Sequence, residues 1–315
     1  MIMKQLMQSA VVVIVCGWLN AQAAVPATWN VEFKAVDESG LPVADAEAWV
    51  AFGIAQYPER SNKWDKVEGL TDANGVFRAS HEDTHSMSLG LHLRKAGYYP
   101  TDVVYELGPS YDEAKWNPAL TLPLKKVGRP IPMYAKWLNV GMPAFDKPIR
   151  FDLTAGDWVA PYGKGTKTDI IFTAHRDMRG DDDFDFKLTV GFPNKGDGIQ
   201  PFSPNTFRPG QGSALRSPHE APDAGYQAEW IKEQSRRPGE PAEYGLDENL
   251  NFFFRVRTIL DEHGKVKSAL YGKIYGDFMH FRYYLNPTPN DRNVEFDPKQ
   301  DLLKGLRGSH VVGAP

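Results

Sequence analysis

Short stretches in which apolar and polar residues alternate constrain this chain more than any other feature. The alternation runs over residues 31–35, returns at 89–94 and appears again at 120–124. Successive side chains of a β-strand point to opposite faces, so this pattern predicts strands with one buried face. We therefore expect residues 31–124 to form a small antiparallel β-sandwich.

Turn-forming residues separate these stretches. Residues 37–46 (DESGLPVADA) and 70–77 (LTDANGVF) each place Asp, Asn, Ser or Gly directly before an extended apolar run. Asn and Gly accept the left-handed backbone angles that tight reversals require. Both phrases therefore predict turns between neighbouring strands.

The order of these phrases resembles a known family. The matching residues are Gly40-x-Pro42-Val43, Ala46-x-Ala48, Thr71-Asp72-x-x-Gly75-x-Phe77 and Gly97-Tyr98. Together they are similar to the carboxypeptidase regulatory-like (transthyretin-like) β-sandwich domain, over about a third of the chain. In that family the sandwich is usually an accessory module, so the resemblance implies an Ig-like architecture more than an activity. The same broad shape also carries the intradiol dioxygenases, which hold iron with two Tyr and two His, but the sequence contains no matching Tyr and His-x-His arrangement.

The first 24 residues have the features of a signal peptide. Lys4 is their only charged residue, residues 10–17 form an apolar core, and Ala21-Gln22-Ala23 provides small residues at cleavage spacing. The apolar run is too short for a spanning helix, so we expect no transmembrane segment after cleavage. The predicted location is secreted or periplasmic.

Cleavage removes the only cysteine, Cys16. The mature chain then has no disulfide, no thiolate nucleophile and no Cys-ligated zinc. It carries 35 basic residues (36 less Lys4) and 40 acidic ones, a net charge of −5. Without a dense basic stripe interleaved with aromatic residues, we expect no nucleic-acid partner.

The length and the distribution of proline predict two domains. The predicted boundaries are a signal peptide at 1–24, the carboxypeptidase regulatory-like sandwich at 25–126, a proline-rich junction at 127–148, a second β-rich domain at 149–300 and a C-terminal tail at 301–315. Residues 133–140 within the junction are strand-like, so we expect the junction to be ordered. The overall fold class is all-β. The second half is expected to be a sandwich or jelly-roll-like domain, and it resembles secreted bacterial proteins without an assigned mechanism.

Several elements are predicted in the second half. Residues 251–260 and 266–275 flank a Gly-containing reversal and form the clearest hairpin of the chain. Residues 193–222 are rich in Pro, Gly, Ser and Asn and predict a long irregular loop. Residues 226–233 predict one short helix, capped by Asp223.

His81-Glu82-Asp83-Thr84-His85 matches the H-E-x-x-H pattern, which on a helix places two imidazoles on one face for zinc. The flanking residues are strand-like rather than helical. We therefore interpret this stretch as an exposed loop at a hairpin tip, with His81 and His85 retained as weak metal-ligand candidates. The sequence indicates no catalytic residue and no cofactor.

The acidic run at 179–185 (RGDDDFD) offers carboxylates that calcium prefers. It lacks the alternating spacing and the distal Glu of a dedicated calcium loop. We interpret it as a solvated turn between strands.

Aromatic residues provide the candidates for ligand binding. Secreted β-sandwiches often stack sugar rings on exposed aromatic side chains. Trp64, Trp116 and Trp158 lie in polar, loop-like sequence where exposure is expected. Core packing of these rings is the alternative.

Three functional classes remain open at this stage. The favoured one is an exported, non-catalytic binding or envelope-associated protein, with an extracellular or envelope polysaccharide as a candidate partner. The second is a secreted hydrolase that uses His81 and His85 with a metal, or a pair of carboxylates. The third is a structural component of the cell envelope, which predicts an extended apolar patch.

Overall fold

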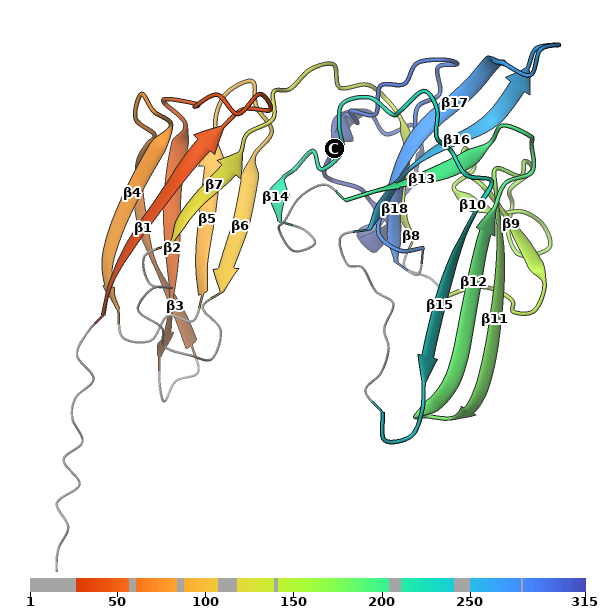
Figure 1. Ribbon diagram of the computed structural model, residues 1–315, viewed down its shortest axis with the longest axis horizontal. Coiled ribbons are helices and arrows are strands. Elements are labelled where there is room, and N and C mark those ends of the chain that lie inside the picture. Colours follow the sequence, from red (N-terminus) through yellow and green to blue (C-terminus); the bar gives the residue numbers. More distant parts are fainter. Residues whose placement is uncertain are drawn as a thin grey trace, which may run out of the picture.

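The computed structural model describes residues 27–56, 61–83, 88–106, 118–138, 141–203, 211–240, 250–278 and 280–315. Figure 1 shows them as two β-rich lobes. The described residues contain two 3₁₀ turns, η2 (Pro298–Gln300) and η3 (Gly308–His310), and no α-helix. The predicted all-β fold class is therefore confirmed. None of the described helices is long and apolar enough to cross a membrane.

Two sheets form the N-terminal lobe. The first has the order β4-β1-β7, and the second has the order β14-β6-β5-β2-β3. Their strands are β1 (Ala27–Val36), β2 (Glu47–Gln56), β3 (Ser61–Leu70), β4 (Val76–Asp83), β5 (Ser88–Arg94), β6 (Thr101–Glu106), β7 (Ala119–Pro123) and β14 (Gly212–Ser213). All pairs are antiparallel except β1 with β7.

The inward side chains of these strands make one hydrophobic core. It contains Phe33 from β1, Phe52 from β2 and Leu91 from β5, all fully buried. Each comes from a stretch with period-two alternation, which places every second side chain on the inner face. All the buried members of this core lie between residues 29 and 124.

The same Asp-x-x-Gly turn occurs at three places in the chain. Asp37 Oδ1 accepts hydrogen bonds from the backbone N–H groups of residues 39 and 41, and Asp72 and Asp261 repeat the pattern at their own turns. The glycine that closes each turn has a positive φ. A Cβ at Gly75 would also lie 2.5 Å from the carbonyl oxygen of Ala35, so only glycine fits there. The turns predicted at 37–46 and 70–77 are confirmed.

Two further sheets face each other in the C-terminal lobe. One has the order β10-β9-β11-β12-β15, and the other has the order β13-β16-β17-β18-β8. Their strands are β8 (Tyr134–Leu138), β9 (Pro148–Asp152), β10 (Asp157–Trp158), β11 (Ile170–Gly180), β12 (Asp183–Gly191), β13 (Gly198–Phe202), β15 (Glu229–Arg236), β16 (Asn251–Leu260), β17 (Val266–Tyr275) and β18 (Phe281–Leu285).

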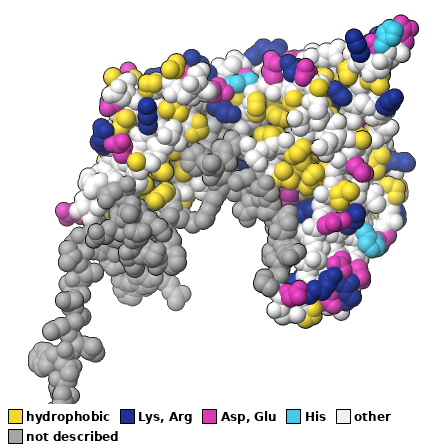
Figure 2. All heavy atoms as spheres, viewed as in Figure 1, with side chains coloured by type: hydrophobic (Ala, Val, Ile, Leu, Met, Phe, Trp, Pro, Cys, Tyr) yellow, Lys and Arg dark blue, Asp and Glu magenta, His cyan; other side chains and the backbone are white. Residues whose placement is uncertain are grey.

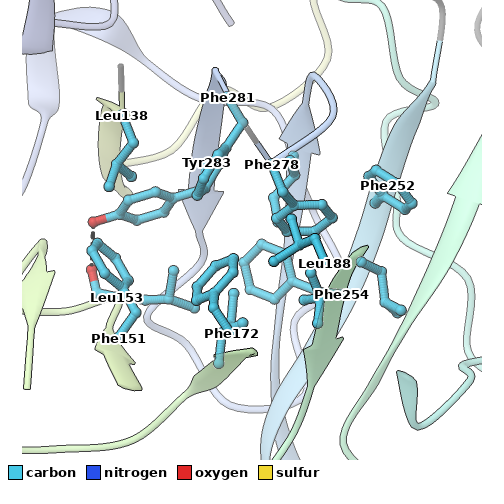
Figure 3. Close-up of a cluster of buried hydrophobic side chains, with 14 of the residues drawn as sticks. Leu138, Phe151, Leu153, Phe172, Leu188, Phe252, Phe254, Phe278, Phe281 and Tyr283 are labelled. Carbon is cyan, nitrogen blue, oxygen red and sulfur yellow. Dashed lines mark hydrogen bonds between the residues drawn. The ribbon is translucent and has the colours of Figure 1, made fainter. Parts of the chain in front are cut away.

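An aromatic core fills the space between these two sheets. Phe172, Phe254 and Phe278 lie at its centre, and Tyr283 Oη donates a 2.9 Å hydrogen bond to the Leu153 carbonyl at one side (Figure 3). The second sheet is also covered on its other face, where Phe253 and Tyr284 belong to a separate buried cluster. Burial on both faces explains why β16 begins with a continuous apolar run instead of an alternation.

The structure corrects two sequence predictions in this half. The predicted helix at 226–233 is wrong, because β15 occupies Glu229–Arg236 and pairs with β12 along its full length. The irregular loop expected at 193–222 contains two strands, β13 and β14. The strand-like stretch of the proline-rich junction forms β8 over residues 134–138, as predicted, and pairs with β18 as an edge strand. The hairpin predicted at 251–260 and 266–275 is confirmed with the same bounds.

The second half of the sequence contributes one short strand to the N-terminal lobe. β14 lies in the second half of the sequence but pairs with β6, which adds it to the edge of the N-terminal sheet. Ala214 N continues this pairing with a 2.8 Å hydrogen bond to Pro100 O. The C-terminal tail packs on the second lobe, where Val312 is buried and Tyr284 Oη donates to Ala314 O.

Because the N-terminal core draws on residues 29–124 alone, we expect a fragment of residues 25–126 to fold without the rest of the chain. β14 contributes only two residues to its sheet. The measurement is chemical denaturation followed by tryptophan fluorescence, with one cooperative transition expected. A fragment that unfolds without cooperativity would show that the two lobes depend on each other, and the boundary near residues 126–147 would be wrong.

Candidate functional site

The outer face of the N-terminal sheet brings together the aromatic side chains that the core does not use. On β2 and β5 every second residue is buried in the core, so the residues between them point to the other face, and Trp64 of β3 lies opposite Gly53 on that face. Trp49, Trp64 and His92 are the aromatic members of this outer set. We call the region that they form with Ala51, Gly53 and Gly90 the aromatic face.

Trp64 is the most exposed aromatic residue of this face, with 56% of its surface accessible. It lies on β3 directly opposite Gly53 of β2. A Cβ added to Gly53 would come within 3.0 Å of the Trp64 ring atoms Cη2 and Cζ3. The indole therefore rests on the bare backbone of β2 and presents its opposite side to solvent.

Trp49 and His92 form a second aromatic group on the same face. They are cross-strand neighbours on β2 and β5, and their rings stack with centroids 4.7 Å apart and planes 13° from parallel. Two cations approach the Trp49 ring: Lys66 Nζ at 4.8 Å and the Arg94 guanidinium at 5.0 Å. Cations placed in this way are attracted by the ring quadrupole, which fixes the position of the indole.

Asp102 interacts with both polar side chains beside the Trp49 ring, His92 and Arg94. Its Oδ1 lies 2.6 Å from His92 Nδ1, and Arg94 Nη2 donates to both carboxylate oxygens at 2.7 and 3.0 Å. Burial alone would raise the pKa of Asp102, but the hydrogen bonds from His92 and Arg94 outweigh it and lower the pKa below its usual value. Asp102 is therefore a carboxylate that orients both partners.

Small residues separate the two aromatic groups. Ala51 faces Gly90 in the register of β2 and β5, and Gly53 lies beneath Trp64. None of the three carries more than a methyl group. From residue 49 to residue 53 the strand rises about 13 Å. Between the Trp49 and Trp64 indoles, β2 and β5 therefore carry only small side chains, and Lys66 of β3 lies opposite Ala51.

The structure places the other tryptophan candidates differently. The expected exposure of Trp158 is wrong: it is 9% exposed and packs edge-on against Phe151 and Phe172 in the aromatic core. Its polar sequence neighbours belong to the turn around β10, whereas the ring points inward. Trp116 lies outside the described residues. Sequence reasoning did not select Trp49 and His92, although both occupy outer positions of alternating strands.

The first histidine of the H-E-x-x-H pattern does not lie in a loop. Residues 81–83 belong to β4, and the His81 ring stacks on Phe52 at 4.6 Å, with Nε2 3.4 Å from Asp65 Oδ2. The expected full exposure of His81 is wrong, because its side chain is only 19% exposed. His81 and Glu82 are successive strand residues and point to opposite faces, unlike the helical zinc pattern. His85 lies outside the described residues.

The acidic run forms the turn between β11 and β12, as predicted. Two arginines neutralise its carboxylates. Arg179 donates hydrogen bonds to Asp183 and Asp185, and Arg237, the residue after β15, donates to Asp185. Figure 2 shows these opposite charges gathered at one end of the C-terminal lobe. Within the part of the chain that the structure describes, no group of three His, Cys, Asp or Glu side chains is arranged to hold a metal ion.

A second polar cluster joins the two lobes at Glu295. Its side chain is 3% exposed and accepts hydrogen bonds from Tyr99 Oη at 2.7 Å and from the backbone N–H groups of Gly128 and Arg129. His219 Nδ1 lies 2.7 Å from Glu295 Oε1, and His219 Nε2 lies 3.0 Å from Glu38 Oε2 in the N-terminal lobe. Burial would raise the pKa of Glu295, but these donors lower it. The carboxylate is thus fully engaged in holding the lobes together.

We expect this junction to weaken as the pH rises. Burial alone would lower the pKa of His219, but the carboxylates of Glu38 and Glu295 outweigh it and raise the pKa above its ordinary value. The protonated imidazole therefore contributes its full stabilisation below about pH 6.5 and loses it as the pH rises through the raised pKa. Glu295 acts oppositely, because its stabilisation is lost as the pH falls through its lowered pKa.

The measurement is the free energy of unfolding of the natural protein and of His219→Gln between about pH 5 and 9. The difference between the two proteins should be largest at the acidic end of the range and shrink towards the alkaline end. A difference that does not change with pH would contradict the assignment of His219 as the charged link between the lobes.

Comparison with known proteins assigns no family. No protein-family model matches the chain, and no curated protein sequence matches it. The resemblance to the carboxypeptidase regulatory-like domain therefore stays a resemblance.

Solved structures give distant similarities. A 3-chlorocatechol 1,2-dioxygenase from Rhodococcus opacus 1CP is 16% identical over 33% of this chain and 62% of its own, with a TM-score of 0.26. A catechol 1,2-dioxygenase from Acinetobacter sp. ADP1 is 10% identical over 35% of this chain and 55% of its own, also at 0.26. The shaft pilin SpaA of Lactobacillus rhamnosus GG is 11% identical over 75% of this chain and 89% of its own, at 0.24. The chain thus spans less than two thirds of either dioxygenase, and TM-scores this low support no functional assignment.

Proposed function

We propose that this protein is an exported, non-catalytic binding protein that holds an extracellular or cell-envelope polysaccharide on its aromatic face. The observation that carries the proposal is the Trp64 indole, which packs against Gly53 and is 56% exposed. A supported, exposed indole offers a rigid apolar plane for the apolar face of a sugar ring. The predicted signal peptide at 1–24 supports export.

The arrangement around Trp64 supports binding by a surface that is already formed. Asp102 orients His92 and Arg94, and the Trp49 ring contacts His92 and the two neighbouring cations. A ligand that meets side chains fixed in this way does not have to order them, so less affinity is lost on binding. Polar groups beside the indoles provide hydrogen-bond partners for sugar hydroxyl groups.

The two other functional classes have less support from the geometry. The polar cluster at Glu295 offers a hydrolase no free carboxylate, because Glu295 is occupied by Tyr99, His219 and two backbone donors. A structural envelope component would favour an extended apolar patch. Among the exposed large apolar residues of the described chain, Trp64, Leu70 and Val104 lie on the N-terminal sheet that carries the aromatic face. Ile231 and Ile259 lie on the two sheets of the other lobe.

The test is retention by a panel of insoluble polysaccharides: cellulose, chitin, xylan and peptidoglycan. We expect the natural protein to be retained by at least one of them and Trp64→Ala to be released. Ile259→Ala is the matched control, because Ile259 is 57% exposed and lies in the other lobe. A protein that no member of the panel retains, or retention that Trp64→Ala does not change, contradicts the proposal.

A further inference from the structure

A pocket of about 440 Å³ lies at one end of the aromatic face. Its lining includes the carboxylates of Asp45 and Glu47, the cations Arg94 and Lys95, and the half-buried ring of Tyr98. Glu47 and Arg94 lie opposite each other in the register of β2 and β5. They therefore occupy the outer face, two residues along from the stacked pair of Trp49 and His92.

Arg94 connects the pocket to the aromatic face. It lines the pocket, and its guanidinium also lies 5.0 Å from the Trp49 ring. Four hydrogen bonds fix this guanidinium, two to Asp102 and one each to the carbonyl oxygens of Leu93 and Thr101. The Trp64 indole packs against Gly53 of β2. From Glu47 to Gly53, β2 rises about 20 Å. Pocket and indole are thus the two ends of one continuous surface.

The pocket has the chemistry of a sugar subsite. Its carboxylates accept hydrogen bonds from hydroxyl groups, its cations donate to ring and hydroxyl oxygens, and the Tyr98 ring provides an apolar wall. Opposite charges lie side by side, so the pocket does not select a strongly charged ligand. A neutral polyhydroxylated ring satisfies both signs of charge.

From this geometry we infer that the protein binds the interior of a linear, neutral polysaccharide, with one sugar ring on Trp64 and another in the pocket. The inference rests on the proposed function and specifies its substrate. A surface about 20 Å long needs an oligosaccharide of several rings, because a disaccharide cannot reach both ends. Oligosaccharides of β-1,4-linked glucose and of N-acetylglucosamine are neutral, linear and available in graded lengths, so they serve as the probes.

The experiment is calorimetric titration with cellobiose, cellotetraose and cellohexaose, and with the matching chito-oligosaccharides. We expect the affinity for one of these two series to rise at least tenfold from the disaccharide to the hexasaccharide. Tyr98→Ala and Glu47→Gln should each lower the affinity for the hexasaccharide about tenfold. Glu47 is exposed, so its variant tests the pocket even if Tyr98→Ala proves unstable. Ile259→Ala is the control.

Equal affinity for the disaccharide and the hexasaccharide would overturn the inference, as would pocket variants that bind the hexasaccharide like the natural protein. Binding to neither series would also overturn it. The proposed function is tested separately. It requires only that at least one polysaccharide of the panel retains the natural protein and releases Trp64→Ala.

Discussion

Replacing Asp277 with Ala is expected to lower the free energy of unfolding by about 3 to 5 kcal/mol, the usual cost of leaving a buried charge without its partner. Asp277 follows β17 and forms an ion pair with Lys232 of β15, whose side chain is only 2% exposed. Phe278, the next residue, lies in the aromatic core. The ion pair therefore links the two sheets of the C-terminal lobe at a site where the ammonium group has little access to water.

Urea denaturation of the full chain measures this effect. The double variant Lys232→Met, Asp277→Leu is the control, because it removes both charges and leaves apolar side chains of similar volume. It should recover most of the lost stability, since a buried pair is often replaced by apolar residues at little cost. A loss below about 1 kcal/mol in Asp277→Ala, as for an exposed pair, would contradict the buried environment assigned to Lys232.

Replacing Trp64 with Ala is expected to weaken polysaccharide binding by at least about thirtyfold. This corresponds to the roughly 2 kcal/mol or more that truncation of a central aromatic contact typically costs. The variant loses the exposed plane above Gly53, and nothing else on β3 replaces it. Because the indole is mostly exposed, the free energy of unfolding should change far less than in Asp277→Ala.

Trp64→Phe provides the graded control for this prediction. Phe retains an aromatic plane of smaller area, so its affinity should fall between those of the natural protein and Trp64→Ala. An equal loss of affinity in both variants would indicate that the indole N–H is required. Unchanged affinity in both would remove Trp64 from the binding surface.

Local pattern was sufficient to predict the hairpin of β16 and β17. Its strands are long and its turn carries the Asp-x-x-Gly pattern, so the information lies within 25 successive residues. The alternating stretches of the N-terminal lobe were predictable for the same reason. In both cases neighbouring residues determine which side chains point inward.

Long-range pairing explains what the sequence did not show. Residues 226–233 resemble a capped helix, but pairing with β12 draws Glu229–Arg236 into a strand with Lys232 on its buried side. β14 is likewise defined by a partner far away in the chain, β6. Tertiary contacts of this kind override local propensity.

In the candidate site, too, local sequence predicted some features, whereas others depend on long-range pairing. The polar neighbours of Trp64 predicted its exposure, and the structure agrees. The same argument failed for Trp158, because the polar residues around it belong to a turn while its ring faces Phe151 and Phe172. The pairing of Trp49 with His92 depends on the register between β2 and β5, which the sequence alone does not give.

The central claim is that a polysaccharide lies on the Trp64 indole, and nuclear magnetic resonance tests it most directly. Seven of the eight tryptophans follow the predicted signal peptide and give indole N–H signals, and the Trp64 signal is the one missing from Trp64→Phe. Titration with the hexasaccharide of a retained polymer, or with soluble fragments of a retained cell wall, should shift the Trp64 signal and leave that of the buried Trp158 in place. Saturation of the protein with ligand while the Trp64 signal stays unmoved would contradict the claim.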